Sequence, residues 1–151
     1  MKSSRSTLKS RNSVIVDTGF WVAIGSTTDR FHDLAIKVGQ SLDLDPVTTW
    51  PVITETSYLL QKMQGSQAVD AFLLGVDQSG ADIFQLERGY LGRIRQLMKK
   101  YADLPMDLAD ASLVILAEEL GHGRILSTDQ RDFHAYRWKN HHPFENLLLG
   151  G

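Results

Sequence analysis

The chain has 151 residues, of which 42% are hydrophobic and 23% charged, a composition typical of a folded globular protein and unlike that of a disordered or fibrous chain. This length accommodates one domain with a hydrophobic core and is too short for two ordinary ones. Because the chain has no cysteine, disulfide bonds, thiolate metal ligands and thiol catalysis are excluded. The lack of cysteine also fits a reducing cytoplasm, which is the location we expect.

The N-terminal segment is basic, with Lys2, Arg5, Lys9 and Arg11, but no long apolar stretch follows it, so neither a signal peptide nor a membrane anchor is predicted. We expect residues 1–12 to form a flexible tail and residues 13–151 to form a single domain. Without those four basic residues, 12 basic residues remain against 18 acidic ones, a net charge of −6. A nuclease of this composition would need local Arg and Lys residues and a cation, because its overall field repels phosphate.

Strand-like and helix-like segments alternate along the chain. Short apolar or β-branched runs predict strands at residues 14–17, 46–49, 81–86 and 124–128. Apolar residues at helical spacing predict helices at residues 20–24, 31–42, 51–63, 68–76, 89–101 and 107–120. This alternation indicates a three-layer α/β/α sandwich with a central, mainly parallel sheet. Ligands of such sheets bind beyond the carboxyl ends of the strands.

The apolar faces of these helices predict which residues reach the core. We expect Leu34 to point inward from the helix at residues 31–42, and Met63 from the helix at residues 51–63. In the helix at residues 89–101, the inward residues should include Leu91, Ile94 and Leu97.

Acidic residues lie close to the ends of several predicted strands. Asp17 and Asp129 end the first and last strands and should therefore lie at the carboxyl edge of the sheet. Glu55 is in the second turn of a helix that starts a few residues after the second strand. Asp107 and Asp110 are three residues apart at the start of a helix and share one face. Four separate segments thus place acids near one edge of the domain.

Each of these acids also has a purely structural explanation. Asp107 is typical of a helix N-cap, with Asp110 in the first turn, where an acid complements the helix dipole, and we prefer this explanation for Asp107. Asp17 and Asp129 fit turns that end strands. Glu55 is harder to explain in this way, because an acid on an apolar helix face is rarely buried without a partner.

A bound cation would offset the electrostatic repulsion between these acids. Carboxylates within a few ångströms repel by roughly 1 to 4 kcal/mol per pair. With oxygen ligands and no cysteine, Mg²⁺ or Mn²⁺ is favoured over zinc, and the five histidines show no zinc-binding spacing. The sequence has no GxxxxGK[ST], GxGxxG or GxSxG motif, and an EF-hand beginning at Asp129 fails because Arg131 and Phe133 would occupy ligand positions.

At these positions the chain resembles the PIN-domain ribonucleases, and in particular the VapC-type toxins of bacterial toxin–antitoxin pairs. Four segments in order carry the resemblance: VIVDTGFWVAI, VITETSYLL, MDLADASLVILAEELG and ILSTDQRDF. By motif order and overall length, the resemblance covers about residues 13–148. By resemblance, the catalytic and metal-binding residues are Asp17, Glu55, Asp110 and Asp129, supported by Thr128, with Asp107 and Asp132 as additional contributors. Residues 138–151 match no motif of the family.

The resemblance also implies an activity and its partners. It implies Mg²⁺- or Mn²⁺-dependent hydrolysis of RNA phosphodiester bonds, a cognate antitoxin protein and a homodimer. Basic side chains near the acids would select the RNA, and the candidates are Arg88, Arg93, Arg95, Lys99 and Arg131. A solvated helix face explains most of these basic residues equally well.

Two other functions are compatible with the sequence. The acidic domain and the exposed-looking Phe20, Trp21 and Phe31 are compatible with a protein-binding module that lacks nuclease activity. An aspartate-based phosphatase with Asp17 as its nucleophile is a weaker alternative, because the second acid expected two residues later is replaced by Gly19.

Overall fold

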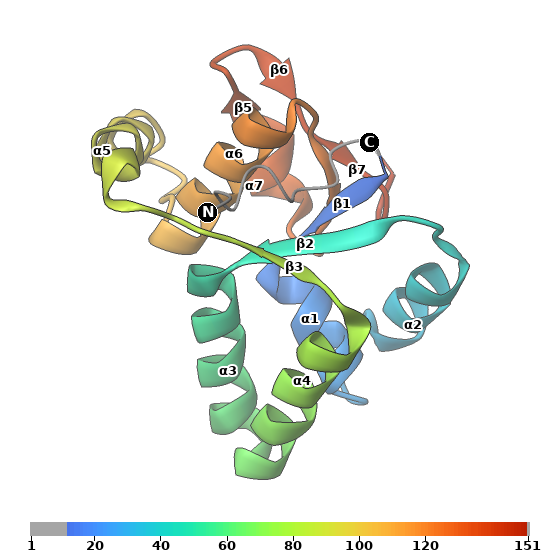
Figure 1. The fold of residues 1–151 in the computed structure, drawn as a ribbon. Helices are drawn as coiled ribbons and strands as arrows, with labels where there is room; N and C mark the ends of the chain where they lie inside the picture. The colour runs from blue at the N-terminus through green and yellow to red at the C-terminus, as the bar shows by residue number, and fades with distance from the viewer. Residues whose placement is uncertain (1–11, 151) are drawn as a thin grey trace, which may run out of the picture.

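The structure is a computed structural model that describes residues 12–150, so residues 1–11 of the predicted tail lie outside the described residues. Its central sheet contains five parallel strands (Figure 1). In spatial order they are β3 (Asp82–Phe84), β2 (Asp45–Thr49), β1 (Ser13–Val16), β4 (Arg124–Leu126) and β7 (Glu145–Asn146). The predicted parallel sheet is therefore confirmed.

Helices cover both faces of this sheet and connect its strands. They are α1 (Thr18–Gly25), α2 (His32–Ser41), α3 (Trp50–Gln64), α4 (Ser66–Ser79), α5 (Leu91–Lys100), α6 (Leu108–Leu120) and α7 (Gln130–Ala135), and the 3₁₀ turn η2 (Arg88–Tyr90) precedes α5. None of the helices in residues 12–150 is both long and apolar enough to cross a membrane.

The side chains of β1 alternate between two hydrophobic clusters. Val14 and Val16 pack with Phe20 of α1 on one face of the sheet. Ile15 packs on the other face with residues of α6, including Leu113. This alternation is the period-two pattern of a strand buried on both faces, and it produces the three-layer arrangement predicted from the sequence.

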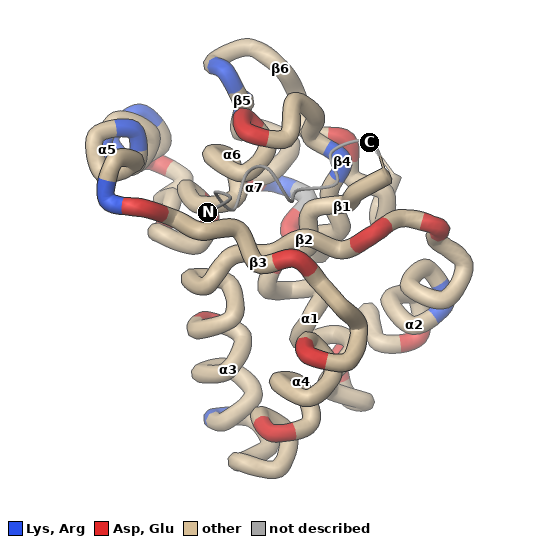
Figure 2. The backbone as a smooth tube through the Cα atoms, viewed as in Figure 1, with Lys and Arg blue, Asp and Glu red and all other residues tan. Residues whose placement is uncertain are grey.

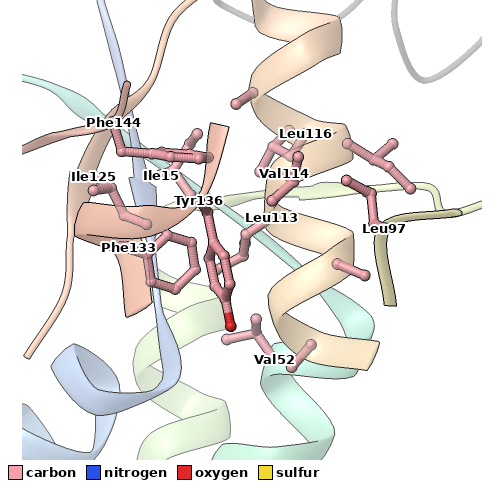
Figure 3. Packing of buried hydrophobic residues seen from close by; sticks show 14 of the residues in the cluster. Ile15, Val52, Leu97, Leu113, Val114, Leu116, Ile125, Phe133, Tyr136 and Phe144 are labelled. Atoms are coloured by element: carbon pink, nitrogen blue, oxygen red, sulfur yellow. The ribbon is translucent and has the colours of Figure 1, made fainter. Parts of the chain in front are cut away.

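Helix α6 is the most deeply buried helix beside the sheet. Leu113, Val114 and Leu116 are fully buried, and they belong to the same cluster as Phe133 and Tyr136 (Figure 3). Each buried leucine contributes about 2 kcal/mol relative to an exposed one. The position of this helix is therefore set by packing along its whole length.

Both ends of α6 are capped. At the start, the Asp107 side chain accepts a hydrogen bond from the Asp110 N–H, and the Asp110 side chain accepts one from the Asp107 N–H. This reciprocal capping box confirms the predicted N-cap role of Asp107. At the other end, Gly121 adopts a left-handed conformation with φ 78°, which favours glycine. The caps fix the axial position of the acids in the first turn.

The C-terminal segment, which had no sequence motif, completes the sheet. Strands β5 (Arg137–Trp138) and β6 (His142–Pro143) form an antiparallel hairpin, and its turn residues Lys139 and Asn140 both have positive φ. A Cβ atom at Gly123 would lie 2.6 Å from the Trp138 indole nitrogen, so glycine is needed where the hairpin packs. The chain then returns as β7 beside β4.

Several sequence expectations differ from the structure. The strand predicted at residues 124–128 ends at Leu126, and residues 127–129 form the loop before α7. Leu34, Met63 and Leu91 were expected to point inward but are 37%, 52% and 53% exposed. Met63 lies in the last turn of α3, which extends away from the sheet (Figure 1), and Leu91 lies in the first turn of α5. Apolar periodicity at helix ends overestimated the width of the buried face.

Candidate active site

Asp17 lies directly after β1 and caps the start of α1. One carboxylate oxygen accepts a hydrogen bond from the Thr18 N–H at 2.7 Å, and the other accepts one from the Ser127 hydroxyl at 2.8 Å. The residue is only 5% exposed. The turn role considered from sequence is therefore real, and it aims the carboxylate at the carboxyl edge of the sheet.

Ser127, the neighbour of the predicted Thr128, forms hydrogen bonds with Asp17 and Asp129. Its oxygen donates to Asp17 and accepts a hydrogen bond from the Asp129 N–H at 2.9 Å, so it joins the ends of β1 and β4. Thr128 lies against Gly19, where a Cβ atom would collide with the threonine hydroxyl. Thr128 therefore shapes the wall of the site.

Glu55 reaches the same region from the second turn of α3. Its carboxylate accepts a hydrogen bond from the Thr18 hydroxyl at 2.7 Å, so Thr18 contacts Asp17 through its backbone and Glu55 through its side chain. Helix α3 starts at Trp50, one residue before the predicted start, with Thr49 as N-cap and proline in its first turn. The α3 helix start thus determines how close Glu55 comes to β1.

Asp110 is held from two sides. Besides its capping contact with Asp107, its carboxylate accepts a hydrogen bond from the Tyr136 hydroxyl at 3.2 Å. Burial and the adjacent Asp110 charge raise the pKa of the Tyr136 phenol, which therefore remains a protonated donor. Tyr136 is the residue that follows α7, so this contact links α6 to the C-terminal part of the chain.

Asp129 and Asp132 form the remaining side of the site. Asp129 caps α7, and its side chain accepts a hydrogen bond from the Asp132 N–H at 3.0 Å. The Asp132 carboxylate lies 3.3 Å from the Arg131 guanidinium Nε, while the rest of Arg131 is exposed. Asp129 therefore has the expected turn role, whereas Asp132 lies in the first turn of α7 rather than in a loop. Both acids lie beside the other carboxylates.

All the predicted acids and Thr128 line one cavity of about 470 Å³. Its walls are Asp17, Thr18, Gly19, Val22, Glu55, Leu59, Leu104, Pro105, Asp107, Asp110, Thr128, Asp129, Arg131 and Asp132. Among these described wall residues, Arg131 is the only basic one. The other predicted RNA-binding residues, Arg88, Arg93, Arg95 and Lys99, lie in or next to α5 and outside the walls.

The acids of the cavity outnumber its one basic wall residue, Arg131, and several of their pKa values are raised. Burial, with repulsion from Asp129 and Glu55, raises the pKa of Asp17 to about 7. Burial, with repulsion from Asp107 and Asp17, raises the pKa of Asp110 to about 8. The pKa values of Glu55 and Asp129 are also raised, mainly by burial. The charged forms of these groups are destabilised until positive charge enters the cavity.

These residues fit a hard divalent cation. Every acid offers carboxylate oxygens, the donors that Mg²⁺ and Mn²⁺ prefer. Within residues 12–150, no three acidic or histidine side chains are already arranged as ligands of a common ion. The hydroxyl groups of Thr18, Ser127 and Tyr136 now donate hydrogen bonds to carboxylates of the cavity. To bind a common ion, those carboxylates would have to change their present arrangement.

Those three hydroxyl residues were not predicted from the sequence. Thr18 and Ser127 each adjoin a residue that was chosen, and hydroxyl side chains at strand ends were a usable signal. Tyr136 is 26 residues from the acid that it contacts, and no local pattern connects the two positions.

Comparison with known proteins agrees with this architecture. The family model of the PIN domain matches residues 14–139, and the chain therefore belongs to the PIN-domain family. Among solved structures, the fold is similar to that of VapC20 from Mycobacterium tuberculosis, a sarcin–ricin loop cleaving toxin, with a TM-score of 0.73 and 20% sequence identity. The similarity covers 79% of this chain and 92% of that one. The comparison with curated proteins found no significant match.

Proposed function

We propose that this protein is a Mg²⁺- or Mn²⁺-dependent endoribonuclease and the toxin of a type II toxin–antitoxin pair. The observation that carries the proposal is the convergence of Asp17, Glu55, Asp110 and Asp129, from four separate segments, on one cavity. Membership of the PIN-domain family and the similarity in fold to a toxin that cleaves RNA support it.

The acids would perform two tasks. When bound, a divalent ion would neutralise the scissile phosphate and polarise a water molecule for in-line attack. Asp17 and Asp110, the more strongly perturbed carboxylates, would hold the ion, with Glu55 and Asp129 as further ligands or as acceptors that orient the water. Arg131, at the rim, is placed to pair with a phosphate oxygen of the substrate.

A cleavage assay tests this function directly. The purified protein should cleave single-stranded RNA with added Mg²⁺ or Mn²⁺ and lose that activity with a chelator. Asp110→Asn should lose activity by at least about a hundredfold, because one ligand of the site is removed. Asp70→Asn is the matched control, since Asp70 is exposed on α4 outside the cavity. Wild-type RNA left intact with both metals would contradict the proposal.

The toxin assignment also requires an antitoxin. A second cavity of about 550 Å³ lies among α1, α2, α4 and the sheet, and its walls are mainly apolar, including Phe20, Trp21, Ile36 and Phe72. We propose that an apolar segment of the antitoxin binds there. A small protein encoded beside this chain should suppress RNA cleavage, and Ala71→Glu on the cavity wall should weaken that suppression while leaving cleavage intact.

The two alternative functions lose part of their basis. Phe20 is buried in the core between α1 and the sheet, and Trp21 and Phe31 are partly buried, so these side chains do not form the exposed apolar surface expected of a protein-binding module. Phe20 and Trp21 line the apolar cavity described above instead. The phosphatase would need an acid at position 19, where any side chain collides with Thr128.

Homodimer formation and a cytoplasmic location remain predictions, and light scattering of the purified protein tests the first.

A further inference from the structure

The basic residues of this acidic protein are concentrated in one segment. Residues 88–102 contain five Lys or Arg residues and no acid, whereas the domain as a whole has more acids than bases. Figure 2 shows this basic segment at α5, on the other side of the view from β1 and β4. A surface of this kind attracts phosphate even though the overall charge is negative.

Helix α5 exposes three basic residues, Arg95, Lys99 and Lys100, to solvent. Ile94 and Leu97 are buried and hold the helix in the core cluster that includes α6. On the other side, an open hollow of about 400 Å³ is lined by Gly92, Arg95, Gln96, Lys99 and Lys100. Gly92 has open space where a Cβ atom would lie, so the hollow is free of protein atoms at that point.

Three rings pack in a row on the hairpin that adjoins α5. The ring centroids of Trp138 and His142 are 4.4 Å apart with their planes at 30°, and those of His142 and His141 are 4.2 Å apart with their planes at 47°. Trp138 and His142 are partly buried, whereas His141 at the end of the row is exposed. Unpaired bases of RNA stack on rings exposed in this way.

Arg93 joins this hairpin to α5. Its guanidinium donates to both Glu118 carboxylate oxygens and to the Asn140 side chain in the hairpin turn. Glu118 also accepts a hydrogen bond from the Lys139 N–H at 2.7 Å. Arg93 was predicted to bind RNA, but these contacts give it a structural role. These hydrogen bonds hold the hairpin with its three rings in a fixed position relative to α5.

The C-terminal end of α5 leads into the acidic cavity. The Tyr101 ring packs against Tyr136 with centroids 5.0 Å apart, and Tyr136 contacts Asp110. Leu104 and Pro105, a few residues later, line the cavity wall. An RNA chain with its scissile phosphate at the acids could thus continue over residues 101–105 onto α5.

We propose that α5 and the β5–β6 hairpin form a second RNA-binding surface, which holds an unpaired segment of the substrate outside the acidic cavity. Arg95, Lys99 and Lys100 bind its backbone phosphates, and a nucleobase stacks on His141. This inference rests on the proposed ribonuclease function and specifies where the substrate is held. It predicts a preference for RNA with an unpaired segment over a continuous duplex.

The test measures RNA binding in a background that cannot cleave. In Asp17→Asn, the affinity for a fluorescent single-stranded oligoribonucleotide should fall by at least about tenfold when Arg95 and Lys99 are both replaced by Glu, and the salt dependence should become shallower by about 0.7 per lost phosphate contact. Lys37→Glu with Lys62→Glu is the matched control, because it changes the charge equally at exposed positions on α2 and α3. Equal thermal stability of the two double variants verifies folding.

The proposed stacking of a nucleobase on His141 is tested separately with His141→Ala. This change should weaken binding of the unpaired oligoribonucleotide by about tenfold and leave binding of a duplex of the same length unchanged. Equal losses in the α5 variant and its control would overturn the inference, as would complete displacement of RNA by an acidic polypeptide at equal charge. If the wild-type protein does not cleave RNA, the proposed function itself is wrong. If the wild-type protein cleaves RNA but the α5 variant binds RNA normally, only this inference is wrong.

Discussion

The acidic cavity and the basic α5 surface are built in opposite ways. The cavity gathers Asp17, Glu55, Asp110 and Asp129 from segments far apart in the sequence, and burial raises the pKa of each. The α5 surface comes mostly from one continuous segment, is exposed, and is tied to the rest of the protein by the Arg93–Glu118 ion pair. The cavity therefore depends on the whole fold, whereas the surface depends on one helix and one hairpin.

The largest expected effect separates chemistry from binding. Asp17→Asn should lower kcat for RNA cleavage by at least about a thousandfold, because several kcal/mol of metal-dependent stabilisation of the transition state are lost. Asparagine still accepts the hydrogen bond from the Thr18 N–H, so the turn should survive. RNA binding should persist, since α5 is untouched. Kinetic and anisotropy measurements on one preparation check both expectations, and a parallel loss of binding would refute the division of labour.

The next effect concerns the stability of the metal-free protein. Asp17 titrates at about 7 and Asp110 at about 8 in the folded protein, whereas unfolded aspartate has a pKa of about 3.9. Between these pH values the folded state binds more protons than the unfolded state, so the free energy of unfolding falls as pH rises. From about pH 5 to about pH 8 we expect a loss on the order of a few kcal/mol.

Thermal denaturation with a chelator measures this loss. At the upper pH, added Mg²⁺ should restore the Tm, since it binds only the folded state. Asp17→Asn should flatten the pH profile of the metal-free protein, because the most buried acid no longer titrates. A metal-free Tm that is constant or rises over this range would show that the carboxylates are less desolvated than the structure indicates.

The sequence anticipated the cavity better than the surfaces around it. Asp17 and Asp129 were found because the carboxyl ends of parallel strands share one edge, a rule that needs only the order of elements. Glu55 and Asp110 followed from helix starts. The sequence prediction named Thr128 as the supporting hydroxyl, whereas the hydroxyl that contacts Asp17 belongs to Ser127. Adjacent side chains point in different directions, and the sequence does not show which of the two neighbouring hydroxyls faces the acids.

The C-terminal part of the fold shows a second limit. Strand β7 has two residues, too few for any periodicity, and it is specified by pairing with β4 rather than by its own sequence. The hairpin before it depends on the contact between Gly123 and Trp138, which are far apart in the chain. Non-local contacts of this kind leave no trace in a single sequence.

Ser127 offers an intermediate effect within the cavity. Ser127→Ala removes the hydrogen bond to Asp17 and the acceptor for the Asp129 N–H. Supporting residues of this type usually change metal affinity or activity by about ten- to a hundredfold. A Mn²⁺ titration of activity should show weaker metal binding in this variant. Ser41→Ala, at an exposed position in α2, should behave as wild type; equal Mn²⁺ affinity in both variants would leave Ser127 a merely structural role.

Tyr136 gives the smallest and most specific effect. Tyr136→Phe keeps the ring packed between Tyr101 and Phe133 but removes the hydroxyl that donates to Asp110. That hydrogen bond favours the charged carboxylate, so its loss should raise the pKa of Asp110 further and weaken metal binding by up to about tenfold. The acidic limb of the pH–activity profile should therefore move to higher pH, with little change in Tm. Tyr58→Phe, on the exposed face of α3, supplies the control. Because packing alone cannot move a pH profile, an unshifted limb would show that Tyr136 serves the core and not the site.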